Sequence, residues 1–375
     1  MNEFRLGARR INRLIPAGVA LCLAFCSGLA HATPDGAETA AVPAPGHYDK
    51  RADVAAFAVE AAKKTGVPIT EIQQWLDDAK YQSSIVEAMN RPAESKTWAQ
   101  YRPIFITPKR IADGVDFWNK YSADLAAIAQ KYQVDPAIIV AIVGVETFYG
   151  QRMGNYRVID ALATLGFDYP KRGAFFRGQL MDFFTLAAKD HIDMNTALGS
   201  YAGAMGMPQF IPSSYLALAV DGDGDGKRDL WHSDADVFAS VANYFAEHGW
   251  VEGGPVSFEI EVKNTAQVAD YLNAARDLKP KVTIGQLRQW GIALPKDLYL
   301  PDSEKVMLFT LTGSDATEYW VGLNNFYVIT RYNHSTLYAM AVWQLSQAIT
   351  AARAAVVPPA GLTPVPVART QAAGE

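Results

Sequence analysis

The stretch Asp135-Pro136-Ala137-Ile138-Ile139-Val140-Ala141-Ile142-Val143-Gly144-Val145-Glu146-Thr147-Phe148-Tyr149-Gly150 decides how the rest of the chain is interpreted. Asp followed by Pro favours the start of an α-helix, because Asp caps the first free N–H groups and Pro fits the first turn. The residues that follow are apolar on every face of a helix, which predicts a helix buried all round. We therefore expect this helix at the centre of the core.

One acid, Glu146, interrupts that apolar run. Removing an ionised carboxylate from water is costly, so we expect Glu146 to be paired, to be neutral with a raised pKa, or to line a cavity. A Glu kept partly neutral by apolar surroundings can serve as a general acid at neutral pH. A helix-end acid that reaches solvent or a core partner would have the same local sequence, so this stretch alone leaves both interpretations open.

The composition predicts a folded protein with a large core. The 375 residues are 50% hydrophobic and 19% charged, which argues against disorder. The length fits one large domain or two to three lobes. The formal charge is −5, and loss of residues 1–32 would make it −8, so nucleic acid is excluded as an expected partner.

Residues 1–32 are typical of a secretory signal peptide. Four arginines precede an apolar run from Leu14 to Ala30, which ends in Ala30-His31-Ala32. The alternative, an N-terminal membrane anchor, is disfavoured because the run is short and contains Pro16 and Gly18. We expect cleavage after Ala32 and a soluble periplasmic protein, peripheral to the membrane at most.

Both cysteines, Cys22 and Cys26, lie inside this segment, so the mature chain would form no disulfide. A lipoprotein signal needs a small residue directly before the modified Cys, but Leu21 and Phe25 stand there. We therefore expect no lipid anchor. Residues 33–46, rich in Ala, Pro and Gly, are interpreted as a linker.

Helical patterns dominate the rest and predict a mainly α protein of the α+β class. Residues 47–110 are expected to form an N-terminal helical lobe completed by the C-terminal helix, with Trp98 to Pro108 as an extended connector. Residues 111–252 should form the core, with one long helix from Ile111 to Tyr132. Period-two alternation after Gly253 predicts a small β-containing lobe over 253–322. Residues 323–353 then return to the core, and 354–375 are expected to be disordered.

Two further stretches carry candidate sites. The small residues of Gly199-Ser200-Tyr201-Ala202-Gly203-Ala204-Met205-Gly206-Met207-Pro208-Gln209-Phe210-Ile211-Pro212-Ser213-Ser214 allow close backbone approach beside polar side chains. Such a stretch could line a site or be a tight packing segment.

Asp221-Gly222-Asp223-Gly224-Asp225-Gly226-Lys227-Arg228-Asp229 has carboxylates at loop positions one, three and five and Gly at six, the spacing of an EF-hand-like calcium loop. His232 stands where a bidentate Glu is usual, so we expect Asp236 to replace it, with Asp234 as second choice. The Lys227 carbonyl should complete the protein ligands of Ca²⁺, and no organic cofactor is expected. The alternative is an acidic surface turn without metal.

With these blocks, the chain resembles the membrane-bound lytic murein transglycosylase B family, whose core is similar to goose-type lysozyme. The resemblance covers roughly residues 50–350 and rests on five motifs in order: Gly144-Val145-Glu146-Thr147, the Gly199–Ser214 segment, the acidic loop before Leu230-Trp231, Val241-Ala242-Asn243-Tyr244-Phe245, and Asn325-Phe326-Tyr327 through Tyr332-Asn333-His334-Ser335. It implies a lysozyme-like helical core that acts on peptidoglycan glycan strands.

The resemblance also implies roles for single residues. Glu146 matches the family's one catalytic Glu, and the residues implied to bind substrate are Ser200, Gln209, Tyr101, Tyr244, Tyr332, Asn333, Tyr338 and Arg172. Lys171-Arg172 stands where the family has two Arg, and Phe175 stands where the family has a Tyr. Both departures affect residues that the resemblance implies contact the peptide stem. Other cell-wall enzymes are conceivable partners, and we expect a monomer.

Ordinary glycosidases use two carboxylates. Only Glu146 is convincing here, because Asp160 and Asp168 are more simply helix-cap or turn residues. One acid suffices if the acetamido group of N-acetylmuramic acid stabilises the cation and its 6-hydroxyl attacks, which gives a 1,6-anhydro product from the β-1,4 bond to N-acetylglucosamine. The sequence leaves two alternatives: a lysozyme-like hydrolase and a non-catalytic, calcium-dependent peptidoglycan-binding protein.

Overall fold

The computed structural model describes residues 44–90, 96–272 and 278–356. The predicted signal peptide, most of the predicted linker and all but the start of the predicted tail lie outside these ranges. Across the described ranges, no single helix combines the length and apolarity needed to cross a membrane; helices α6 and α7 meet the criterion only as a pair, with a bend of 113° between them.

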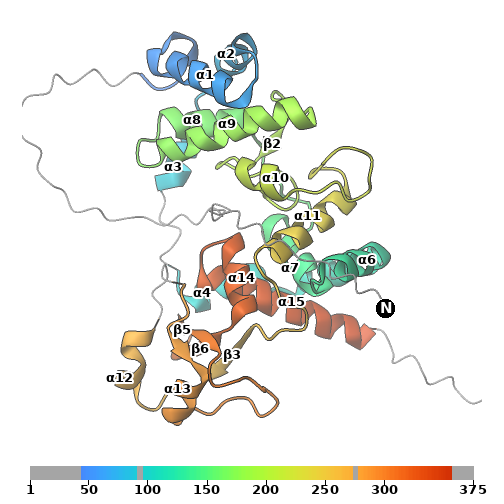
Figure 1. Cartoon of the computed structure of the whole chain (residues 1–375), viewed down its shortest axis with the longest axis vertical. Coiled ribbons are helices and arrows are strands. Elements are labelled where there is room, and N and C mark those ends of the chain that lie inside the picture. Colours follow the sequence, from blue (N-terminus) through green and yellow to red (C-terminus); the bar gives the residue numbers. More distant parts are fainter. Residues whose placement is uncertain (1–43, 91–95, 273–277, 357–375) are drawn as a thin grey trace, which may run out of the picture.

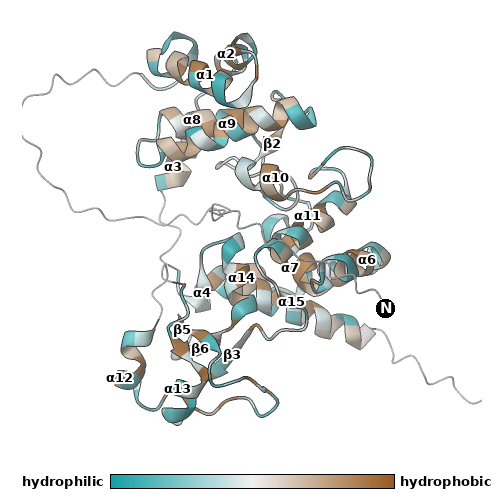
Figure 2. Cartoon of the chain, in the orientation of Figure 1, coloured by the Kyte–Doolittle hydropathy of each residue, from teal (hydrophilic) through white to brown (hydrophobic). Residues whose placement is uncertain are grey.

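The central helix is α7 (Pro136–Thr147), which begins where the sequence predicts. Oδ1 of Asp135 accepts a hydrogen bond from the Ala137 N–H at 2.8 Å. Every residue from Ala137 to Val145 is buried, and Figure 2 shows the helix in hydrophobic colours. The helix ends in two left-handed residues, Phe148 (φ 53°) and Tyr149 (φ 60°). This ending folds the Tyr149 ring back onto Gly144, where a Cβ would lie 2.7 Å from the tyrosine oxygen.

The half of the molecule drawn below α10 in Figure 1 is built around α7. Two expectations for this half were wrong. The segment from Trp98 to Pro108, expected to be an extended connector, contains a helix. The single helix expected over Ile111 to Tyr132 is two helices, because Tyr121 leaves the helical conformation and packs its ring on that of Phe238, with centroids 5.2 Å apart. The helices here are α4 (Trp98–Phe105), α5 (Pro108–Lys120), α6 (Ser122–Tyr132), α11 (Asp234–Glu247), α14 (Asn324–Tyr332) and α15 (Thr336–Val356).

The other half consists of two stretches of chain that pack together. It contains η1 (Tyr48–Lys50), α1 (Ala52–Thr65), α2 (Ile69–Asp77), α3 (Ser83–Asn90), α8 (Val158–Phe167), α9 (Gly173–Asp190) and α10 (Pro212–Leu218). The N-terminal helices pack on α8 and α9, whereas α15 packs against α4, α5 and α7. The C-terminal helix thus contacts the predicted N-terminal lobe, residues 47–110, through α4, and the predicted domain division stays a prediction.

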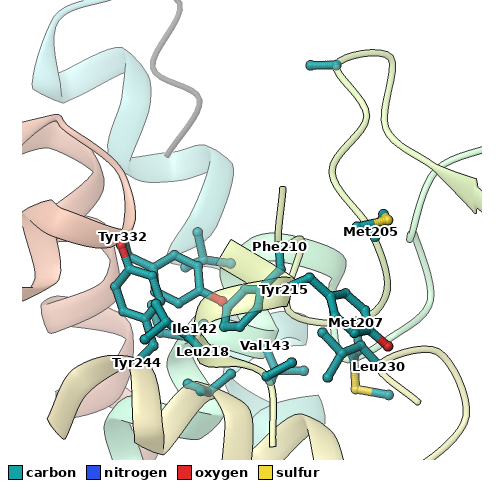
Figure 3. Packing of buried hydrophobic residues seen from close by; sticks show 14 of the residues in the cluster. Ile142, Val143, Met205, Met207, Phe210, Tyr215, Leu218, Leu230, Tyr244 and Tyr332 are labelled. Atoms are coloured by element: carbon teal, nitrogen blue, oxygen red, sulfur yellow. The ribbon is translucent and has the colours of Figure 1, made fainter. Parts of the chain in front are cut away.

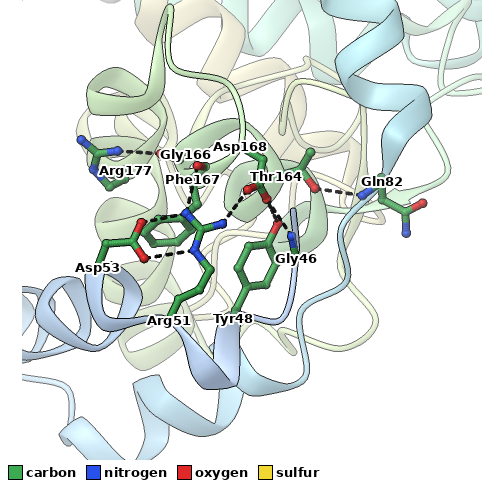
Figure 4. Close-up of polar contacts among 10 residues, drawn as sticks. All are labelled: Gly46, Tyr48, Arg51, Asp53, Gln82, Thr164, Gly166, Phe167, Asp168 and Arg177. Carbon is green, nitrogen blue, oxygen red and sulfur yellow. Dashed lines mark hydrogen bonds and ion pairs between the residues drawn. The ribbon is translucent and has the colours of Figure 1, made fainter. Parts of the chain in front are cut away.

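Buried acids anchor the N-terminal stretch (Figure 4). Asp168 accepts from Nη1 of Arg51 at 2.5 Å and from the Tyr48 hydroxyl at 2.9 Å. Asp160 accepts from the Lys80 N–H at 2.8 Å and pairs with Arg157. These two acids thus join elements that lie far apart in sequence, which goes beyond the helix-cap or turn roles expected of them.

The small β lobe has its own core. Its sheet has the order β3-β6-β5-β4 with antiparallel pairing, and Met307 lies opposite Gly322. Its elements are β3 (Ser257–Ile260), α12 (Thr265–Val268), η3 (Ala269–Tyr271), β4 (Val282–Thr283), α13 (Ile284–Gln289), β5 (Lys305–Thr312) and β6 (Thr317–Gly322). The buried cluster includes Val282, Leu287, Leu308 and Val321 and is separate from the main core. A β-containing lobe is therefore present where the alternation predicts it.

The Gly199–Ser214 segment folds as a small β structure rather than as packed helix. β1 (Tyr156–Arg157) pairs with β2 (Leu198–Gly199), and Met205 bridges both Gly199 and Phe210. Gly206 has φ 67°, and a Cβ there would lie 2.4 Å from the Leu230 oxygen. Figure 3 shows the segment's apolar side chains packed against Val143 and Leu230. The small residues thus let this segment lie directly on the backbone at Leu230, just after the acidic loop, and on α7.

Candidate active site

A pocket of about 170 Å³ lies where α7 meets the Gly199–Ser214 segment. Its walls come from four parts of the chain: the end of α7, the small β structure, α11 and the end of α14. The lining residues are Glu146, Ser200, Tyr201, Ala204, Gln209, Phe210, Ile211, Ser214, Tyr244, Tyr332 and Asn333. Six of the residues predicted to act on substrate therefore share one cavity.

Glu146 lies at the wall of this pocket on the last turn of α7. Only a minor part of its surface is accessible, through the pocket. Burial raises the pKa of Glu146 to about 7, and the hydrogen bond from Tyr338 opposes that rise. The hydroxyl of Tyr338 donates to Oε1 of Glu146 at 2.5 Å. The acid can therefore exist in both protonation states near neutral pH, as proton transfer in both directions requires.

Three tyrosines form one side of the site. The Tyr332 ring lies 4.7 Å from that of Tyr244 and is nearly parallel to that of Tyr338, with centroids 6.5 Å apart. The Tyr332 hydroxyl donates to the Pro208 carbonyl and the Tyr244 hydroxyl to the Arg331 carbonyl, both at 2.6 Å. Burial, followed by the charge of Glu146, raises the pKa of Tyr332 and of Tyr338. These phenols stay protonated, and Tyr244 and Tyr332 present ring surface rather than hydroxyls to a ligand.

The opposite side carries two polar side chains whose existing hydrogen bonds limit what they can offer. Oγ of Ser200 accepts from the N–H groups of Ala202 and Ala204, so its own hydrogen is available to a ligand acceptor. Nε2 of Gln209 donates to the Met153 and Gly206 carbonyls at 3.1 and 2.9 Å, which leaves its Oε1 to accept. Gln209 also has φ 54°, a strained backbone that this fixed side chain accompanies.

Three predicted substrate residues lie outside the pocket lining, namely Tyr101, Arg172 and Tyr338, whose bond to Glu146 is described above. Tyr101, on α4, is close enough to Tyr338 to influence its pKa, so it lies near the Glu146 carboxyl that Tyr338 contacts. Arg172 precedes α9, and its guanidinium lies over the Phe175 ring at 4.5 Å. The structure thus brings Tyr101 toward Glu146, whereas Arg172 belongs to a separate position at the start of α9.

Some pocket residues escaped the sequence analysis. Tyr201 and Ile211 lie within the quoted small-residue segment but were not singled out there. His248 stacks on Tyr244 with ring centroids 4.1 Å apart. Tyr201 could have been predicted, because it is an aromatic residue directly next to Ser200. The contact of His248 with Tyr244 arises because one turn at the end of α11 places the two rings together.

The acidic loop brings three of its predicted ligands together. One carboxylate oxygen each from Asp221, Asp223 and Asp236 lies within 4.8 Å of the others. Asp236 is buried, and its two oxygens accept from the N–H groups of Gly222 and Asp229. Hard oxygen donors in a tight turn suit Ca²⁺ chemically. Asp225 is exposed and accepts from the Lys227 N–H, and Asp234 lies at the start of α11, so neither belongs to this group of three.

Comparisons with known proteins define the class. A family model described as Transglycosylase SLT domain matches residues 49–347. The chain belongs to this family and is a peptidoglycan lytic transglycosylase. It is 41% identical over 318 residues to the membrane-bound lytic murein transglycosylase B of Escherichia coli (strain K12). The aligned residues make up 82% of this chain and 85% of that protein. The non-catalytic alternative is thereby removed.

Solved structures agree with this assignment. The soluble lytic transglycosylase SltB1 from Pseudomonas aeruginosa, in a catenated form, superposes with a TM-score of 0.77 at 46% identity, over 82% of this chain and 99% of that one. The Escherichia coli lytic transglycosylase Slt35 in complex with calcium gives 0.74 at 41% identity, over 83% and 97%. SltB3 from Pseudomonas aeruginosa in complex with NAG-anhNAM-pentapeptide gives 0.70 at 31% identity, over 79% and 78%. The mainly α, lysozyme-like fold with a small β lobe is confirmed.

Proposed function

We propose that Glu146 is the single acid and base of a reaction that cleaves the β-1,4 bond between N-acetylmuramic acid and N-acetylglucosamine. The observation that carries this proposal is a largely buried carboxyl with a pKa of about 7 at the wall of a polar and aromatic pocket. Within the described part of the chain, no second carboxylate lines that pocket. Asp160 and Asp168 are used instead to anchor the N-terminal stretch.

The reaction proceeds in two proton transfers. Protonated Glu146 gives its proton to the leaving O4 of N-acetylglucosamine as the bond to the anomeric carbon breaks, and the muramyl acetamido oxygen stabilises the resulting cation. The Glu146 carboxylate then takes the proton from the muramyl 6-hydroxyl while O6 bonds to the anomeric carbon. Atoms balance without water, and the product is a 1,6-anhydro ring.

The pocket's hydrogen-bond arrangement supports this assignment of roles. The free hydrogen of Ser200 suits the acetamido carbonyl, and Oε1 of Gln209 suits a sugar hydroxyl or N–H. Asn333 is a further polar contact, and the rings of Tyr244 and Tyr332 give the flat surface on which a sugar face packs. Tyr101 would extend the site along the glycan, and Lys171 and Arg172 would meet the peptide stem.

Two structural relatives give independent support for a glycan ligand. Slt35 is described in complex with bulgecin A, and SltB3 in complex with NAG-anhNAM-pentapeptide. We take peptidoglycan strands as this chain's substrate, with a monomer as the acting species. We also propose that other cell-wall enzymes are partners of this protein.

The Asp221, Asp223 and Asp236 carboxylates are proposed to hold Ca²⁺, with Asp225 and the Lys227 carbonyl completing the shell. The gathered oxygens support this, as does the calcium complex described for Slt35. A bound cation would neutralise three carboxylates that otherwise repel one another. It would serve the fold of the loop and has no place in the proton transfers.

We further propose export to the periplasm with cleavage after Ala32 and no lipid anchor. The basic and apolar pattern of residues 1–32 and the Leu21 and Phe25 before the cysteines support it. The Escherichia coli relative is named as membrane-bound, so the two proteins would differ here. N-terminal sequencing of the mature protein should start at Thr33, and a lipid-modified Cys would contradict the proposal.

Mass spectrometry of muropeptides released from purified sacculi tests the reaction. Wild type should release chains with 1,6-anhydro ends, each lighter by one water than a hydrolysis product. Predominantly reducing ends would instead identify the lysozyme-like hydrolase.

A further inference from the structure

The hydroxyl of Thr147 connects the helix that carries Glu146 to the segment that lines the pocket. Thr147 is buried, and its Oγ1 lies 2.9 Å from the Met207 carbonyl and 3.3 Å from the Val143 carbonyl of its own helix. The same oxygen accepts from the Gly150 N–H at 3.0 Å. One side chain thus bonds the end of α7, the turn that follows it and a second turn 60 residues away.

The turn that contains Met207 also contacts the backbone just after the acidic loop. The Met207 N–H donates to the Leu230 carbonyl at 2.8 Å, and Leu230 is fully buried. Gly206 lies so close to this carbonyl that a Cβ would approach it to 2.4 Å, so the turn at residues 206 and 207 packs directly against Leu230. One residue before Leu230, the Asp229 N–H donates to Oδ2 of Asp236 at 2.6 Å.

These contacts form a continuous series of backbone and side-chain hydrogen bonds between the two sites. It runs from Asp236 through Leu230 and Met207 to Thr147, the residue next to Glu146. On its pocket side, Gly206 also accepts from both the N–H and Nε2 of Gln209, at 3.2 and 2.9 Å. A shift of the backbone at Leu230 would therefore reach both Glu146 and the Gln209 amide.

We propose that Thr147 is a positioning residue that couples the metal loop to the glycan pocket, so that calcium and glycan strengthen each other's binding. The inference rests on the proposed calcium and glycan functions and adds the link between them. Thermodynamic linkage requires that each ligand change the affinity of the other by the same factor. Because hydrogen bonds join Met207 to Leu230 on one side and to Thr147 on the other, order imposed by either ligand is transmitted to the other site.

Calorimetric titration of the Glu146→Gln protein tests the coupling without turnover. The ligands are Ca²⁺ and a tetrasaccharide of alternating N-acetylglucosamine and N-acetylmuramic acid, each titrated with and without the other. We expect each to tighten the other's Kd by the same factor, at least about 5-fold. Adding Thr147→Val should bring that factor within about 2-fold of one while both ligands still bind, and Thr147→Ser should restore it. Thr185→Val is the matched control, because Thr185 likewise bonds the carbonyl four residues earlier in its helix.

Kinetics in otherwise wild-type protein give a second readout. With calcium present, Thr147→Val should lower kcat about 10-fold to 10²-fold and leave KM nearly unchanged, because a displaced acid slows the chemical step. If Ca²⁺ or the tetrasaccharide fails to bind the Glu146→Gln protein, the corresponding proposed function is wrong and the coupling falls with it. If both bind but independently, or if Thr147→Val keeps the coupling factor, only the present inference is overturned.

Discussion

Tyr338 donates a hydrogen bond of 2.5 Å to Glu146, although 192 residues separate them in the chain. The bond stabilises the ionised carboxylate and so opposes the rise in pKa that burial causes. The phenol also fixes one carboxylate oxygen, which leaves the other free to face the glycosidic bond. The position and the proton affinity of the acid therefore depend on α15.

Replacing Tyr338 by Phe should raise the pKa of Glu146 further, because the bond that favours its ionised form is lost. The alkaline limb of the kcat/KM profile, expected near pH 7 in wild type, should move to higher pH. The maximal rate should fall about 10-fold, since the carboxyl is less well oriented. A pH–rate profile on soluble glycan measures both effects. An unchanged alkaline limb would show that Tyr338 does not control the titration of Glu146.

Glu146→Gln should lose activity by at least about 10²-fold while glycan binding persists. The amide keeps the shape of the side chain and can still accept from Tyr338, but it neither gives nor takes the required proton. Release of anhydro-muropeptides and tetrasaccharide binding are the two measurements. Wild-type turnover by this variant would remove Glu146 from the mechanism.

The same variant should become relatively more stable as pH rises. Below about pH 4.5, Glu146 is protonated in both the folded and the unfolded chain and imposes no cost. Between about 4.5 and 7 only the unfolded chain has released the proton, so the free energy of unfolding falls with pH, and above 7 the loss is constant. Glu146→Gln should thus gain up to roughly 3 kcal/mol over wild type at pH 8 and almost nothing at pH 4. Denaturant titrations at both pH values give this difference, and a gain independent of pH would contradict the proposed titration.

Chelation should lower the melting temperature of wild type, because a cation bound only to the folded state stabilises it by mass action. The double variant Asp223→Ala, Asp225→Ala should lose that sensitivity. Asp315→Ala, an acid in the turn between β5 and β6 well away from the loop in sequence, is the control and should keep it. Identical melting of wild type in chelator and in excess calcium would rule the metal out.

Asp168→Ala should destabilise the fold by about 3 kcal/mol, because it leaves a buried guanidinium and a buried phenol without their shared acceptor. Asp53→Ala removes the other, more exposed partner of Arg51 and should cost less than about 1 kcal/mol. Neither acid lines the pocket, so kcat of the folded fraction should stay within about twofold of wild type. Unfolding curves of the two variants, compared side by side, would expose an error in this ranking.

The sequence predicted the parts of the site that depend on local signals. The cap at Asp135, the unbroken apolar run and the regular acidic spacing of the metal loop each determine structure over a few residues, and each was found. Trp98–Phe105 was misjudged because Pro103 and Pro108 suggested extended chain, although Oε1 of Gln100 accepts from the Thr97 N–H and stabilises the helix start. The break at Tyr121 is a tertiary effect, set by rings on α5 and α11.

Relationships between distant segments could not be predicted from physical patterns alone. No periodicity links Thr147 to Met207 or Asp168 to Arg51, since each contact exists only after segments distant in the sequence have packed together. The resemblance to a family named Tyr338 as a cleft residue but could not specify that its hydroxyl bonds the acid.

The contribution of α14 and α15 to the pocket also sets when the enzyme can first act. Glu146 leaves the ribosome well before Tyr332, Asn333 and Tyr338, which follow much later in the chain. A nascent chain, or one cut by a protease before Tyr332, therefore contains the acid without the wall and the hydroxyl that make it useful. Fragments that end before Tyr332 are therefore expected to be inactive, so activity reports a chain that extends at least through Tyr338.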